Sequence, residues 1–132
     1  MEYEESKIAR LKKEIDASNS KRSALIEEID AHFVSKLGMT PTDDWSNLYI
    51  NSQTLGEMID KLSILCLKRF FIELKLEKAP SQSINIHFQN IQKIEQLLRY
   101  TIACYDRFVQ HLSEGKGYMP YGQFKIYDVA VK

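Results

Sequence analysis

Polar side chains interrupt the apolar faces of two helix-periodic segments, and these residues have the clearest capacity for chemistry. On the first segment, Asp16, Asn19 and Arg22 follow one another at steps of three. On the second segment, Asp60 lies in line with an apolar stripe. Because an isolated buried charge is costly, we expect Asp60 to have a basic partner. The candidates for that partner are Arg22, Lys68 and Lys125.

Two interpretations of this polar set are open. In the first, it forms a structural ion pair that fixes how two helices align. In the second, it lines a pocket for an anionic ligand such as a sugar nucleotide or a sugar phosphate. The candidate ligand-binding residues of the second interpretation are Asp16, Asn19, Arg22, Asp60, Lys61, Ser63, Lys68, Lys125 and Tyr127.

Familiar catalytic and metal-binding motifs are missing from the sequence. The five glycines fit neither a P-loop nor a dinucleotide-binding pattern. The three histidines are far apart, and none has a second ligand at metal-binding spacing. Ser63 lies within a helical segment, whereas a serine nucleophile normally sits on a sharp turn. We therefore predict no catalytic residues, no metal site and no cofactor, and we favour a non-enzymatic role.

Composition narrows the class of partner and the expected location. Lys and Arg number 18, as do Asp and Glu, so no net charge attracts a polyanion, and nucleic acid is not an expected partner. No apolar run approaches the roughly 20 residues that span a bilayer. The first residues are acidic, whereas a secretory signal begins with basic ones. We therefore expect a cytoplasmic protein without a membrane span, with Cys66 and Cys104 as buried free thiols.

Apolar residues that recur every three or four positions predict three long helices, at about 4–37, 53–78 and 84–114. Gly38 and Pro80 are the stop signals of the first two. Residues 38–51 have no period and form a long connection, and the aromatic tail, residues 115–132, should fold back on the helices. The predicted fold is all-α and a single domain over residues 1–132. It is an antiparallel three-helix bundle with a long first connection and an irregular aromatic C-terminal tail.

The middle helix is apolar on two sides. One stripe runs from Leu55 to Leu76, and a second stripe, in line with Asp60, consists of Ile64, Leu67, Phe71 and Leu74. Both sides of such a helix need cover. A second copy of the chain would supply it in a two-fold homodimer. The competing expectation is that the tail and the loop around Trp45 cover the second stripe within one chain.

Three segments of the sequence carry a resemblance to a known family. They are Ile15-Asp16-Ala17-Ser18-Asn19 with Arg22 and Glu28-Ile29-Asp30, then Ile50-Asn51-Ser52 with Ile59-Asp60-Lys61-Leu62-Ser63-Ile64-Leu65 and Leu67-Lys68, and Tyr121 with Gln123-Phe124-Lys125-Ile126-Tyr127-Asp128. With these segments the chain resembles a bacterial family known as domain of unknown function 4254, and the similarity runs from about Leu11 to Asp128. The chain departs from the family pattern at Lys61, Gln53 and Phe71, where arginine, glutamate and histidine are usual, and it resembles a form shortened at the N-terminus.

The resemblance implies a cellular setting, which is the bacterial cytoplasm with a link to cell-envelope polysaccharide synthesis. It does not imply a mechanism. Two functional hypotheses follow. The first is a helical assembly or adaptor protein that self-associates, binds a protein partner and is accessory to that synthesis. The alternative is a small binding protein or enzyme for an anionic ligand. The two differ in whether the polar set opens on a concave pocket or is consumed in ion pairs.

Overall fold

The computed structural model describes residues 2–39, 42 and 44–119. Three long helices make up most of the chain: α1 (Glu2–Leu37), α2 (Leu55–Glu77) and α3 (Ile84–Ser113). Two short strands, β1 (Tyr49–Ile50) and β2 (Gly117–Tyr118), complete the described elements. The all-α, three-helix class is therefore confirmed, and each helix begins and ends within two residues of the expected bounds. None of the three helices is both long and apolar enough to cross a membrane.

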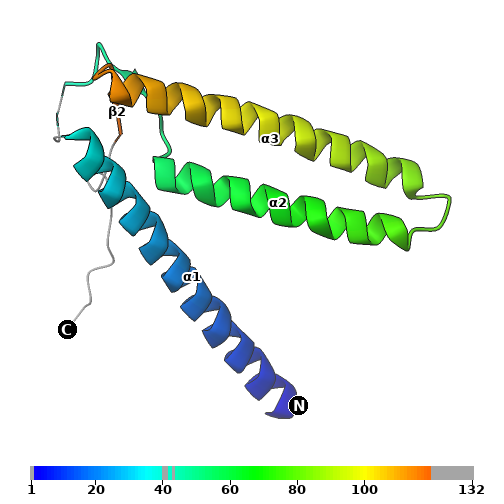
Figure 1. The fold of residues 1–132 in the computed structure, drawn as a ribbon. Coiled ribbons are helices and arrows are strands. Elements are labelled where there is room, and N and C mark those ends of the chain that lie inside the picture. Colours follow the sequence, from blue (N-terminus) through cyan, green and yellow to red (C-terminus); the bar gives the residue numbers. More distant parts are fainter. Residues whose placement is uncertain (1, 40–41, 43, 120–132) are drawn as a thin grey trace.

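Helices α2 and α3 form an antiparallel hairpin (Figure 1). Thr54 and Glu57 form a capping box that starts α2, as their spacing indicates. The ion pair between Arg69 of α2 and Glu95 of α3, 2.8 Å long, joins the helices along their length. The core lies at the end of the hairpin where α2 begins and α3 ends, and it consists of Leu55, Met58, Phe108, Leu112 and Met119.

Helix α1 diverges from this hairpin (Figure 1). Its C-terminal turns contact the start of α2, but every residue from Glu4 to Leu25 is exposed. A closed antiparallel bundle of all three helices is therefore not confirmed. The reason is geometric: α1 has 36 residues against 23 in α2, and it crosses α2 close to one end, so its N-terminal half extends away from the hairpin.

The connection between α1 and α2 meets the segment that follows α3 beside the core. Strands β1 and β2 pair in parallel, with Tyr49 opposite Gly117 and Ile50 opposite Tyr118. Tyr49 stacks on His111 with ring centroids 4.1 Å apart, and Trp45 stacks on Tyr118 at 6.1 Å. Positive φ angles at Gly38 and Gly115 end α1 and α3. Tyr118 and Met119 are buried, so the described start of the tail does return to the core. Phe124 to Tyr127 lie outside the described residues.

Several expected burials are wrong in detail. Cys66 is an exposed free thiol, and Cys104 is half-buried. The second stripe of α2 is open as well: Leu67, Phe71 and Leu74 are all exposed. The Trp45 loop does not cover them, since Trp45 packs on Tyr118 beside the core.

Candidate functional site

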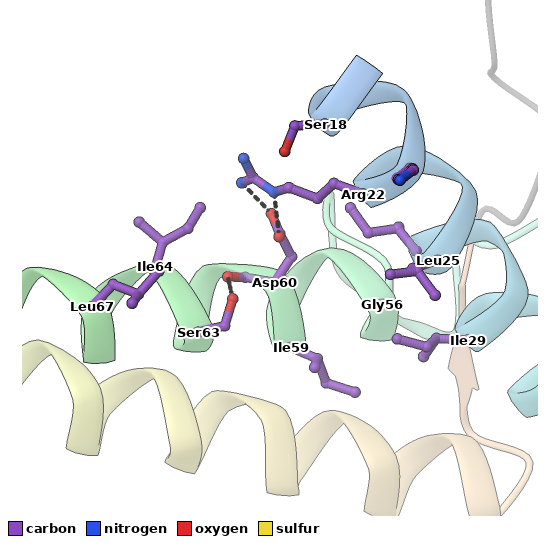
Figure 2. Close-up of a pocket in the computed structure, with 12 residues that line it drawn as sticks. Ser18, Arg22, Leu25, Ile29, Gly56, Ile59, Asp60, Ser63, Ile64 and Leu67 are labelled. Atoms are coloured by element: carbon purple, nitrogen blue, oxygen red, sulfur yellow. Dashed lines mark hydrogen bonds and ion pairs between the residues drawn. The ribbon is translucent and has the colours of Figure 1, made fainter. Parts of the chain in front are cut away.

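An open cleft of about 460 Å³ lies where α1 and α2 part. Its lining is mainly apolar, with one bridge of charged side chains across it (Figure 2). Helix α1 contributes Ser18, Lys21, Arg22, Leu25, Ile26 and Ile29, and helix α2 contributes Gly56, Ile59, Asp60, Ser63, Ile64 and Leu67.

The bridge is a bidentate ion pair between Arg22 of α1 and Asp60 of α2 (Figure 2). Arg22 Nε donates to Asp60 Oδ1 at 2.5 Å, and Arg22 Nη2 donates to Asp60 Oδ2 at 2.6 Å. These hydrogen bonds lower the pKa of Asp60 and raise the pKa of Arg22 from their ordinary values. The two oxygens of Asp60 are thereby occupied, and the guanidinium charge of Arg22 is balanced within the chain.

At its closed end the cleft is fixed by a buried contact between Asp30 and Gly56. Asp30 is 4% exposed, and its Oδ1 accepts a hydrogen bond of 2.7 Å from the backbone N–H of Gly56. A Cβ atom at Gly56 would lie 2.6 Å from the carbonyl oxygen of Ile26. Glycine is therefore required here, because α1 passes directly over the first turn of α2.

The first turn of α2 does not offer a free anion-binding site. The N–H of Leu55 donates to the sulfur of Met119 at 3.3 Å, and the N–H of Glu57 donates to the Thr54 hydroxyl at 3.1 Å. Together with the Asp30 contact, these bonds occupy the donors that an anion would use at a helix N-terminus. The carboxyl group of Asp30 also occupies the position that an anion would take there.

The structure brings only part of the expected polar set together. Arg22 and Asp60 pair as expected, and the Ser63 hydroxyl beside them donates to the backbone oxygen of Asp60 at 2.7 Å. Of the other expected residues, Asp16, Asn19, Lys61 and Lys68 are not part of the cleft lining, and Lys125 and Tyr127 lie outside the described residues.

The residues that could act on a ligand are few. Of the two basic side chains in the lining, Arg22 is paired and Lys21 is exposed. Within residues 2–39, 42 and 44–119, no group of three or more His, Cys, Asp and Glu side chains is placed to hold a metal ion. Apolar side chains provide most of the remaining surface, so the cleft is better suited to a hydrophobic segment than to a charged small molecule.

Sequence reasoning did not single out Asp30 or Gly56 as a pair. Each left a signal in the sequence. Asp30 is an acidic residue between the apolar positions Ile26 and Phe33, and Gly56 is an isolated glycine just inside a helix, which often marks a close approach of two backbones. Neither signal identifies the partner, because the contact joins segments 26 residues apart.

A protein-family model, described as protein of unknown function (DUF4254), matches residues 1–121. The chain belongs to this family. Every described residue of the cleft falls within the DUF4254 match, including both members of the Arg22–Asp60 pair. No curated protein and no solved structure matches the chain.

Proposed function

We propose that this DUF4254 protein is a helical assembly protein that self-associates through the cleft between α1 and α2. The observation that supports the proposal is that two apolar faces border an open cleft. On α2 that face continues from the cleft lining through Leu67 to Phe71 and Leu74, which are exposed. On α1 it continues through Ile15, Leu11 and Ile8, which are exposed as well.

The balance of exposed and buried side chains supports the same proposal. Among the described residues, seven apolar side chains are buried and 15 large ones are exposed. Scattered exposed apolar residues are ordinary, but contiguous stripes on two facing helices are typical of a surface that another chain covers.

The alternative function, binding of a sugar nucleotide or sugar phosphate, has less support. An anionic ligand needs cations or backbone donors that are not already used. Here Arg22 is neutralised by Asp60, and the first donors of α2 are taken by protein atoms. Lys21 is then the basic side chain of the lining that has no ion pair among the described residues. Lys61 and Lys68 are not part of the cleft lining.

We also propose, on the family resemblance alone, that the protein acts in the bacterial cytoplasm as an accessory to cell-envelope polysaccharide synthesis, with a protein of that machinery as a further partner. A bacterial strain that lacks the gene should then make less envelope polysaccharide. An unchanged polysaccharide profile would remove this part of the proposal and leave self-association unaffected.

Sedimentation equilibrium over a hundredfold range of concentration tests self-association. We expect a species of twice 15.4 kDa that dissociates on dilution, and we expect Phe71→Glu to dissociate it. The matched control is Tyr100→Glu, which places the same charge on an exposed aromatic position of α3 away from the cleft. A single 15.4 kDa species throughout would refute the proposal. A dimer that is broken by Tyr100→Glu and not by Phe71→Glu would move the interface to α3.

A thermal-shift screen against sugar nucleotides and sugar phosphates tests the alternative. A ligand at 100 times its dissociation constant stabilises the folded state by about 2.7 kcal/mol. Stabilisation that is lost in Arg22→Ala would favour ligand binding over assembly.

A further inference from the structure

We propose that the occupant of the cleft is helix α1 of a second copy, running antiparallel to α1 of the first. This inference rests on the proposed self-association and specifies its interface. By two-fold symmetry, each copy inserts its own α1 beside the other's α1 and against the exposed face of the other's α2.

Helix α1 carries the repeat that such pairing requires. Its cleft-facing side has residues at alternating steps of three and four, the spacing of a coiled-coil seam. Four of these residues, Ser18, Arg22, Leu25 and Ile29, line the cleft. The seam continues toward the N-terminus through Ile15, Leu11 and Ile8, which are 58%, 43% and 66% exposed. These three seam residues therefore have no cover within the described part of the chain.

Charged residues flank the seam in a regular order. Lys7, Glu14, Lys21 and Glu28 follow one another at intervals of seven residues, each directly before every second seam position. Their signs alternate along the helix. All four are exposed, and none of them takes part in an ion pair among the described residues. They are therefore available to a partner helix.

The alternating signs favour an antiparallel partner. In an antiparallel pair these flanking positions face each other, so one alignment places Lys7 opposite the partner's Glu28 and Glu14 opposite the partner's Lys21. Symmetry repeats both pairs, which gives four attractions. In a parallel pair Lys7 would face the partner's Lys12, which is repulsive, and Glu14 would face the partner's Asn19.

The same antiparallel alignment also places the seam residues of the two α1 helices opposite one another. It places Ile8 against the partner's Leu25 and Ile15 against the partner's Ser18. Leu11 then meets the partner's Arg22, whose charge is balanced by Asp60 of its own chain. A polar layer inside an apolar seam specifies the alignment of helices at some cost in stability. On its other side, the inserted helix contacts Ile64, Leu67 and Phe71 on α2 of the copy whose cleft it enters.

Charge reversal in sedimentation equilibrium tests this alignment. Lys7→Glu and Glu28→Lys should each weaken the homodimer by about tenfold at low salt, because each turns two attractions into repulsions. An equimolar mixture of the two variants should dimerise as tightly as wild type, since both pairs are attractive in the heterodimer. The double variant should also recover. Lys13→Glu, the same charge change on the outer side of α1, is the control and should have no effect.

The outcomes separate this inference from the proposed function. A wild-type monomer at all concentrations would refute both. A wild-type dimer with unchanged single variants, or without recovery in the mixture, would refute the alignment and leave self-association standing. A tighter dimer in Lys7→Glu would indicate parallel helices, because it relieves repulsion from the partner's Lys12. Circular dichroism verifies that each variant folds, and Glu14→Lys with Lys21→Glu repeats the test at the second pair.

Discussion

The carboxylate of Asp30 on α1 accepts a 2.7 Å hydrogen bond from the backbone N–H of Gly56 on α2. This buried contact and the Arg22–Asp60 ion pair both join α1 to α2 at the cleft. They lie two turns apart on α1 and set where α1 crosses α2. The open side of the cleft, which the proposed partner enters, begins beyond the second of them.

Removing the Asp30 carboxylate should destabilise the fold. Asp30→Ala leaves the buried N–H of Gly56 without an acceptor, and the expected loss in unfolding free energy is about 1–3 kcal/mol. Asp30→Asn keeps an oxygen that can accept, so it should lose less. Urea unfolding of both variants measures the difference. Asp16→Ala, at an exposed site on the same helix, is the control, and an equal effect there would contradict the role of Asp30.

Adding a methyl group at Gly56 should also destabilise the fold, although alanine is the better helix former by about 1 kcal/mol. The new Cβ would lie 2.6 Å from the Ile26 carbonyl oxygen and 2.7 Å from Asp30 Oδ1. Overpacking of this kind costs about 1–3 kcal/mol, so the net effect of Gly56→Ala is a lower unfolding free energy. Ser63→Ala in the same helix should stay within about 0.5 kcal/mol of wild type. A stabilised Gly56→Ala protein would show that α1 does not pass so close to α2.

The contribution of the Arg22–Asp60 pair should depend on pH. Pairing lowers the pKa of Asp60 in the folded state, so the pair stabilises the fold above the unfolded-state pKa of about 3.9. That contribution is lost as the pH falls through the lower folded-state pKa. Asp60→Asn should therefore have a lower urea midpoint than wild type near neutral pH, and the difference should shrink in acid. Asp16→Asn, the same substitution at an exposed site of α1, is the control. A gap between Asp60→Asn and wild type that persists in acid would contradict this explanation.

The sequence predicts the three helices and the Arg22–Asp60 pair well. The helices depend on local patterns of residues, and the pair depends on the need of a charge on an apolar stripe for a partner. Helix bounds follow from periodic apolar residues and from signals such as the Thr54–Glu57 capping box. The Arg22–Asp60 pair is predictable because a charge on an apolar stripe requires a partner, and few basic residues are candidates. The contact between Asp30 and Gly56 is not, since it depends on the angle at which α1 crosses α2.

That angle also explains why the expected antiparallel packing of all three helices is not confirmed. Apolar faces on three helices favour packing against other helices. They do not show whether those other helices belong to the same chain or to a second one. Ile8, Leu11 and Ile15 have the spacing of core residues and are exposed in the structure. Intrachain and interchain packing require the same pattern of residues, so the pattern alone cannot separate them.

The N-terminal half of α1 should become stable only on assembly. Residues 4–18 are all exposed, and an isolated helix of about 15 residues is marginal in water. Their amides should therefore exchange hydrogen nearly as fast as an unfolded peptide in dilute solution, and at least about tenfold more slowly above the dimer dissociation constant. Hydrogen exchange followed by mass spectrometry at two concentrations measures this change. The segment from Thr101 to Leu112, which contains buried core residues, is the internal control, and its exchange should depend far less on concentration.

Lys7→Glu should reduce the protection of residues 4–18 at a fixed concentration. Equal protection of these residues at both concentrations, with the dilute sample monomeric by sedimentation, would show that the helix needs no partner.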